Sequence, residues 1–231
     1  MTRTYQPALA PAQFDAVIFD MDGTMVDTEL IYHIAWREAA AALGYTLTEE
    51  TLLATTGRRI VDCYALLEEA LGPTFPMDTF KGSWESYWHR EVEHHGVPLK
   101  PGVLALLDLL ESRSVPKAVA TSTERAEARF TLEKAGLYQR FPSLTTGDEI
   151  KAGKPAPDIF LLAAERLGIA PTRCLALEDS VAGAIAASTA GMTTIMIPDM
   201  IHPPSDVAQQ LHGVVASLHD VHTWIQRLWS T

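Results

Sequence analysis

The chain has 231 residues, which is enough for one large domain or for a domain that carries a smaller inserted one. Hydrophobic residues make up 47% and charged residues 20%, which is the balance of an ordinary globular protein. The net charge of −11 disfavours a nucleic-acid or anionic-membrane surface, because both need clustered Lys and Arg.

Residues 1–12 carry Pro and Ala but lack the apolar run of a signal peptide, so they are predicted to form a loose tail. No apolar run approaches the length of a membrane span. Cys63 and Cys174 lie far apart, in a helix-like and a strand-like stretch, and we interpret both as buried packing residues. Two such cysteines fit a reducing compartment, and we expect a cytoplasmic protein.

The first predicted strand, residues 16–19, runs into the pentapeptide Asp20-Met21-Asp22-Gly23-Thr24. The apolar run Ala-Val-Ile-Phe indicates a buried strand of a parallel sheet. Two carboxylates two residues apart on an extended chain point to the same side, at the strand end where open α/β sheets hold ligands. The two negative carboxylates would repel each other, and a hard cation such as Mg²⁺ would relieve this repulsion. An Asp-Gly turn alone is a common turn signal, but a buried strand followed by paired acids, Gly and Thr is a specific combination.

Helical patterns dominate the next part of the chain. The periodicity predicts helices over residues 28–43, 59–71 and 77–95, and Thr46 and Glu49 have capping-box spacing for a short helix between the first two. We interpret residues 28–98 as a helical domain inserted into a core made of residues 1–27 and 99–231.

From Gly102 onward, helices and strands alternate. The predicted strands cover residues 117–120, 143–146, 174–177 and 193–197, with a short edge strand at 214–215. The predicted helices cover residues 103–112, 124–135, 158–167, 181–190 and 221–228. This alternation predicts an α/β fold, with a parallel sheet that has helices on both faces.

Polar residues follow three of these strands or precede the helices after them. The hydroxyls and N–H groups of Thr121-Ser122-Thr123 can bind a phosphate oxygen, although such residues before a helix are more often N-caps. Lys154, set between Gly and Pro, is positioned to neutralise a phosphoryl oxygen, and Lys151 competes for that role. Glu178-Asp179-Ser180 ends strand 174–177, where the alternative role is a helix N-cap.

Taken together, the motifs Asp-x-Asp-Gly-Thr, Ser/Thr, Lys-Pro and Glu-Asp occur in one order, and the chain resembles the haloacid dehalogenase-like hydrolase superfamily from Phe14 to about Leu228. The resemblance implies a Rossmann-like core, and residues 28–98 are similar to the all-helical cap of the superfamily's first cap type. Residues 27–29, 153–160 and 178–183 resemble the β-phosphoglucomutase and sugar-phosphatase branch.

The resemblance also implies roles for the acidic residues. Asp20 would attack phosphorus and form an aspartyl-phosphate, and Asp22 would act first as the general acid and then as the general base. The Asp20 carboxylate, the Asp22 backbone carbonyl and Asp179 would hold Mg²⁺. Glu178 would order a metal-bound water.

Phosphate and leaving group would be bound by other residues. Thr121, the Ser122 N–H and Lys154 would hold the phosphoryl oxygens as charge shifts in the transition state. Arg58 or Arg59, in the loop that this branch points at its active site, would read a leaving group such as a sugar or a sugar acid. The alternative for these two arginines is a solvated helix start.

The function implied is a Mg²⁺-dependent phosphatase acting on a small phosphorylated metabolite, as a monomer or weak dimer. A β-phosphoglucomutase-type mutase is the alternative. The mutases carry a His in the first cap helix where this chain has Tyr32, and His33 lies one residue further, about 100° around the helix. This departure favours the phosphatase.

Three other classes fit less well. The dehalogenases of the superfamily lack the second acid, Asp22. A receiver domain would be about half this length, without the insert. A catalytically idle binding protein would not need the full set of acids and the Lys.

Overall fold

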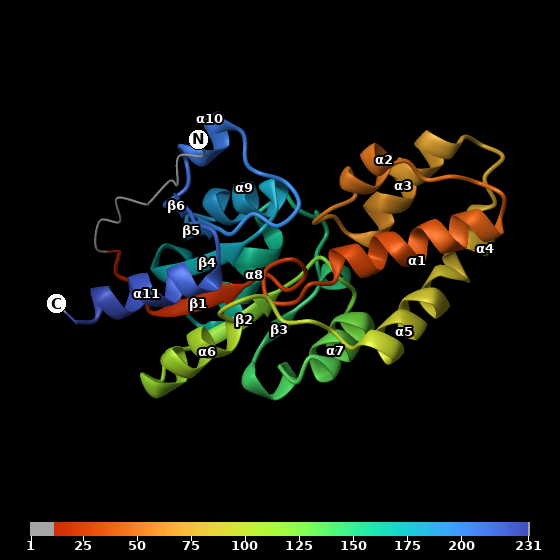
Figure 1. Ribbon diagram of the computed structural model, residues 1–231. Coiled ribbons are helices and arrows are strands. Elements are labelled where there is room, and N and C mark those ends of the chain that lie inside the picture. Colours follow the sequence, from red (N-terminus) through yellow and green to blue (C-terminus); the bar gives the residue numbers. More distant parts are fainter. Residues whose placement is uncertain (1–11, 231) are drawn as a thin grey trace, which may run out of the picture.

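Figure 1 shows a computed structural model of the protein, which describes residues 12–230. The loose tail expected at the N-terminus lies outside the described residues, except for Ala12. None of the helices within residues 12–230 combines the length and the apolar composition that a bilayer span requires.

A parallel six-stranded sheet organises the described part of the chain, in the order β3-β2-β1-β4-β5-β6. Its strands are β1 Ala16–Phe19, β2 Lys117–Ala120, β3 Leu144–Thr145, β4 Cys174–Glu178, β5 Thr193–Met196 and β6 Gly213–Val214. The strand order reverses between β1 and β4, and the carboxyl ends of strands at such a point are where open α/β sheets bind ligands. The predicted α/β fold class is confirmed.

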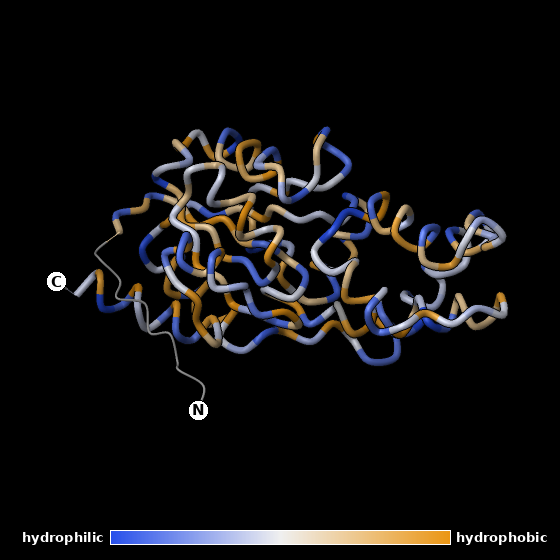
Figure 2. The backbone as a smooth tube through the Cα atoms, turned by 90° about the horizontal axis from the view of Figure 1, so that it is seen from above, coloured by the Kyte–Doolittle hydropathy of each residue, from blue (hydrophilic) through white to orange (hydrophobic). Residues whose placement is uncertain are grey.

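Side chains of β1 alternate between two apolar cores, as expected for a strand buried on both faces. Ala16 and Ile18 belong to the core under α8 (Asp158–Leu167) and α9 (Val181–Thr189). Val17 and Phe19 belong to the core under α6 (Val103–Ser112), α7 (Arg125–Lys134) and α11 (Leu218–Leu228). Figure 2 shows these apolar stretches in the middle of the core, with hydrophilic segments outside.

The segment after β1 forms a group of helices beyond the carboxyl ends of the strands, on the right of Figure 1. These helices are α1 Glu29–Ala42, α2 Glu49–Leu53, α3 Ile60–Leu71, α4 Met77–Lys81 and α5 Trp84–His95. The two segments that join them to the sheet run side by side: Val26 bridges Leu99 in antiparallel fashion, and the Asp27 N–H donates to the Pro98 carbonyl at 2.9 Å.

Three helix predictions were wrong in their bounds. The short helix expected to start with a capping box of Thr46 and Glu49 begins instead at Glu49, with Thr48 as its N-cap. The helix expected over residues 77–95 is divided into α4 and α5, because Gly82 ends the first and Ser83 turns its hydroxyl and N–H back to the Phe80 carbonyl. Helix α11 begins at Leu218, three residues before the predicted start, because a capping box opens it. The remaining short helices are α10 Ser205–Ala208, η1 Tyr138–Arg140, η2 Gly147–Glu149 and η3 Pro171–Arg173.

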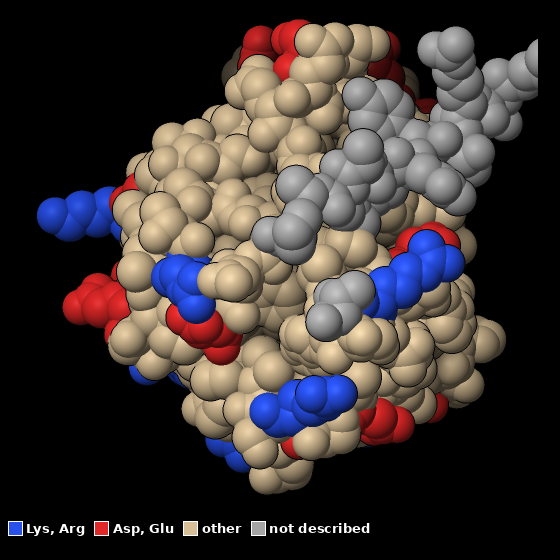
Figure 3. Space-filling view, turned by 90° about the vertical axis from the view of Figure 1, so that its left-hand side faces the viewer, with Lys and Arg blue, Asp and Glu red and all other residues tan. Residues whose placement is uncertain are grey.

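The end of the core opposite the inserted helices is shown in Figure 3. Cationic and anionic side chains lie interspersed on the part of this face drawn in colour, and they do not gather into patches of one sign. Side chains of opposite charge also form ion pairs, such as the bidentate pair of Arg173 with Asp15.

Candidate active site

Asp20 lies directly after β1 and is held by a lysine from a distant part of the chain. The Lys154 Nζ lies 2.6 Å from Asp20 Oδ1 and also donates to Glu178 Oε1. The Lys154 side chain is only 1% exposed. Burial alone would lower the pKa of Lys154, but the charges of Asp20 and Glu178 outweigh it and raise that pKa. The site therefore has a permanent positive charge beside Asp20.

A buried acidic cluster surrounds this ammonium group. Asp20, Glu178 and Asp179 each offer a carboxylate oxygen, and these oxygens lie within 4.8 Å of one another. Burial raises the pKa of Asp20, and the charge of Lys154 opposes that shift. Oxygen donors packed this closely are the ligands that a hard divalent cation prefers, so the residues fit such an ion.

Gly23 allows Asp179 to approach the β1 turn closely. Its φ is +79°, and a Cβ at this position would lie 2.3 Å from Asp179 Oδ2. The hydroxyl of Thr24 donates to the other oxygen of that carboxylate at 3.1 Å. Both residues belong to the Asp-Gly-Thr motif, which therefore positions Asp179 as well as ending the strand.

Three threonine hydroxyls donate to the carboxylate of Asp22. Thr28 reaches Oδ1 at 2.5 Å, and Thr123 and Thr121 reach Oδ2 at 2.7 and 3.3 Å. Burial raises the pKa of Asp22, and these hydrogen bonds oppose the shift. A carboxyl group with a raised pKa can both give and take a proton, so Asp22 is suited to general acid or base chemistry beside Asp20.

Several contacts join the inserted helices to the core around these acids. The Ser122 hydroxyl donates to the Gly57 carbonyl at 3.1 Å, and Arg59 Nη1 donates to the Lys151 carbonyl at 3.2 Å. Glu127 on α7 accepts a hydrogen bond from the indole N–H of Trp88 on α5. The insert therefore lies directly over the acids at the strand ends.

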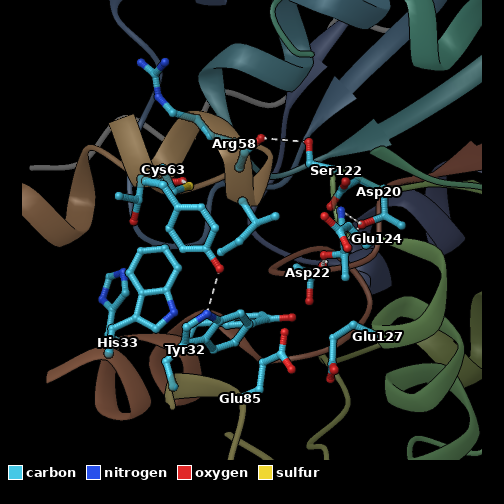
Figure 4. A pocket seen from close by; sticks show the side chains of 18 residues that line it. Asp20, Asp22, Tyr32, His33, Arg58, Cys63, Glu85, Ser122, Glu124 and Glu127 are labelled. Atoms are coloured by element: carbon cyan, nitrogen blue, oxygen red, sulfur yellow. Dashed lines mark hydrogen bonds between the residues drawn. The ribbon is translucent and has the colours of Figure 1, made fainter. Parts of the chain in front are cut away.

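A cavity of about 150 Å³ lies between the insert and the core. Asp20, Asp22 and Ser122 line it from the core, and His33 lies at the far side (Figure 4). The rest of its lining is largely aromatic, with Tyr32, Trp36, Tyr64 and Trp84. The cavity can therefore accept a small molecule that places one of its ends against Asp20.

Arg58 lies at the wall of this cavity, but its guanidinium points away from Asp20 and Asp22 (Figure 4). Its Nε donates to the Ala54 carbonyl at 2.9 Å. The guanidinium of Arg59 is bound by Asp62. This geometry gives no support to the predicted role of Arg58 in binding substrate.

A family model of haloacid dehalogenase-like hydrolases matches residues 14–191. The chain belongs to that family. The sequence-based resemblance is thereby confirmed. Of the described residues outside the match, 192–230 contain β5, α10, β6 and α11, and none of them lines the cavity beside Asp20.

Named relatives cover most of the chain. A phosphorylated carbohydrates phosphatase of Thermotoga maritima is 34% identical over 206 residues, covering 89% of this chain and 88% of its own. The fructose-1-phosphate phosphatase YqaB of Escherichia coli is 34% identical over 189 residues, covering 80% of this chain and 96% of its own. With the site described above, these relatives identify the chain as a phosphoric monoester hydrolase.

The fold has solved counterparts. The crystal structure of CbbY from Rhodobacter sphaeroides in complex with phosphate superposes with a TM-score of 0.74 at 25% identity, covering 89% of this chain and 95% of that one. Such agreement over nearly the whole length includes both the sheet and the inserted helices.

The structure brings the predicted acids and Lys154 together, and it adds residues that sequence reasoning did not place there. That reasoning did not assign Thr28 or His33 to the site, and it treated Glu178 as a partner of water rather than of Lys154. Thr28 resembles an ordinary N-cap in the sequence, but its hydroxyl makes no cap hydrogen bond and turns to Asp22 instead.

Proposed function

We propose that the protein hydrolyses the phosphate monoester of a small carbohydrate through an aspartyl-phosphate on Asp20, with Mg²⁺ as its cofactor. The observation that supports this proposal is the pairing of Asp20 with the buried ammonium of Lys154 at 2.6 Å, beside the hydroxyl-bound Asp22. The carbohydrate is inferred from the printed names of the Thermotoga and Escherichia relatives.

The first half of the reaction follows from the positions of two carboxyl groups. A carboxylate oxygen of Asp20 attacks phosphorus, and the bond from phosphorus to the leaving oxygen breaks. Asp22, whose pKa is raised by burial, gives its proton to that oxygen, so the product leaves as an alcohol. Lys154 neutralises charge on the phosphoryl oxygens, and we assign the Thr121 hydroxyl and the Ser122 N–H to the same oxygens.

In the second half, Asp22 takes a proton from water, and the resulting hydroxide attacks phosphorus. The bond from phosphorus to Asp20 breaks, and inorganic phosphate leaves with both carboxyl groups restored. Asp20, the backbone carbonyl of Asp22 and Asp179 are the residues we assign to Mg²⁺. When bound, the ion supplies charge neutralisation between the carboxylate and the phosphate.

We further propose that residues 28–98 form a cap domain over a core of residues 1–27 and 99–231. Contacts such as that of Ser122 with Gly57 close the cavity over Asp20, which excludes bulk water while the leaving group is present. We expect the cap domain to open by a hinge motion at the two connecting segments, which pair at Val26 and Leu99.

Release of inorganic phosphate from p-nitrophenyl phosphate tests the proposal. We expect turnover with Mg²⁺, none in excess EDTA, and recovery when Mg²⁺ is restored. Asp20→Asn should abolish turnover, whereas Asp15→Asn, at the opposite end of β1, should retain it. Undiminished turnover in EDTA or in Asp20→Asn would contradict the proposal.

A further inference from the structure

The wall of the cavity beside Asp20 carries negative charge in addition to that of Asp20 and Asp22. Glu85, at the start of α5, and Glu124, at the N-cap of α7, both line it. The one cationic side chain in the described lining is Arg58, whose guanidinium points away (Figure 4). The positive charge of Lys154 is already shared between Asp20 and Glu178.

The field of these two carboxylates reaches into the cavity. Tyr64 lines the same cavity, and the pKa of its phenol is raised, first by burial and further by the charges of Glu85 and Glu124. A second anion that occupied the cavity would meet the same repulsion.

Two buried side chains with neutral hydrogen-bonding groups line the far side of the cavity. His33 is 2% exposed and Trp36 is 4% exposed, and among the described residues neither His33 Nε2 nor Trp36 Nε1 has a partner. The two residues lie three positions apart on α1, which places them on one face of the helix. Buried polar atoms without partners are costly, so a ligand that satisfies them gains affinity.

The chemistry of the two atoms is complementary. Burial lowers the pKa of His33, which keeps the ring neutral. A neutral imidazole with its proton on Nδ1 presents Nε2 as an acceptor, and His33 Nε2 has no partner among the described residues. Trp36 Nε1–H can only donate.

On the basis of the proposed function, we infer that the leaving group is an uncharged polyol, with a hydroxyl bound by His33 Nε2 and Trp36 Nε1, and that Glu85 and Glu124 reject leaving groups carrying a carboxylate or a second phosphate. A hydroxyl both donates and accepts, which matches this pair of atoms. Repulsion by Glu85 and Glu124 selects against anionic leaving groups without any additional contact to the uncharged polyol.

Two compounds that differ only at one carbon test the charge selection. Sorbitol 6-phosphate ends in a hydroxymethyl group and 6-phosphogluconate ends in a carboxylate. We expect kcat/KM to favour sorbitol 6-phosphate by about tenfold or more. Glu85→Gln and Glu124→Gln should each narrow this ratio of the two kcat/KM values about threefold, the effect of one unit charge that acts through a high effective dielectric. Glu133→Gln, on the outer face of α7 and paired with Arg129, should leave the ratio unchanged.

Two substitutions at one position test the hydroxyl contact. His33→Phe should lower kcat/KM for sorbitol 6-phosphate about three- to tenfold, the range of one neutral hydrogen bond, and should spare p-nitrophenyl phosphate, which has no hydroxyl on its leaving group. His33→Gln, which keeps an acceptor, should recover part of the loss. Circular dichroism melts of each variant verify folding.

The outcomes separate this inference from the proposed function. Equal kcat/KM for the two sugar compounds, or a ratio insensitive to Glu85 and Glu124, would overturn the charge selection while phosphatase activity stands. Equal losses on sorbitol 6-phosphate and p-nitrophenyl phosphate in His33→Phe would overturn the hydroxyl contact. Absence of phosphate release from all three compounds would instead sink the proposed function.

Discussion

The amino group of Lys154 and the carboxylate of Asp20 lie 2.6 Å apart although 134 positions separate the two residues in the chain. The loop before α8 brings the lysine to the carboxyl end of β1, and Glu178 at the end of β4 holds it from the other side. In the proposed reaction, a buried cation fixed in this way would be oriented for a phosphoryl group before substrate arrives.

The first prediction concerns this cation. Lys154→Ala should lower kcat about a hundred- to a thousandfold, the usual effect of removing one preorganised electrostatic stabiliser. It should also destabilise the fold, since Asp20 and Glu178 would remain buried without their partner. Lys151→Ala, an exposed neighbour in the same loop, is the control and should change kcat little. Rates are compared per folded protein, and a larger loss at Lys151 would reverse the assignment.

The second prediction concerns Gly23 and the proposed Mg²⁺ site. Gly23→Ala places a methyl group against Asp179 and should raise the Mg²⁺ concentration for half-maximal activity about ten- to a hundredfold, as when a metal ligand loses its orientation. Gly44→Ala is a matched control: its φ is +82°, but nothing lies within 4 Å of the added Cβ. Both variants bear the same backbone strain of about 1–2 kcal/mol. Equal Mg²⁺ titrations for the two would contradict the prediction.

The third prediction concerns the pH dependence of stability. Burial lowers the pKa of His33, while Glu49 raises it and Arg37 lowers it further. As the pH falls below about 6.5, the imidazole of His33 binds a proton more readily in the unfolded state than in the folded state. The free energy of unfolding therefore decreases as the pH falls. His33→Gln should weaken this decrease between pH 7 and pH 5 in urea titrations. His202→Gln, at an exposed site, should leave the slope unchanged.

The fourth prediction separates hydrolysis from phosphoryl shuttling. The mutases of the branch carry a His where this chain has Tyr32, whose ring stacks on Trp88 with centroids 4.1 Å apart. We therefore expect β-glucose 1-phosphate, supplied with a trace of glucose 1,6-bisphosphate, to yield inorganic phosphate and little glucose 6-phosphate. Rapid formation of glucose 6-phosphate without phosphate release would make the mutase the correct assignment.

Much of the core could be predicted because its signals are local. The apolar run of β1 and the Asp-Gly-Thr turn follow from neighbouring residues, and the alternation after Gly102 predicted the order of strands and helices. The break at Gly82 and Ser83 could not be predicted with the same success. A two-residue interruption leaves the apolar periodicity of 77–95 intact, whereas the hydrogen bonds to the Phe80 carbonyl decide the break.

The sequence by itself determined which polar residues gather at the carboxyl ends of the strands: Asp20, Asp22, Lys154 and Asp179 each stand beside a strand end or a fixed turn, where backbone geometry sets their direction. Only the tertiary structure decided what surrounds them. Glu85 in α5 and Glu124 at the N-cap of α7 line one cavity, and His33 lines it from α1. The charge and polarity of a cavity depend on distances between such residues, and spacing along the chain does not encode those distances.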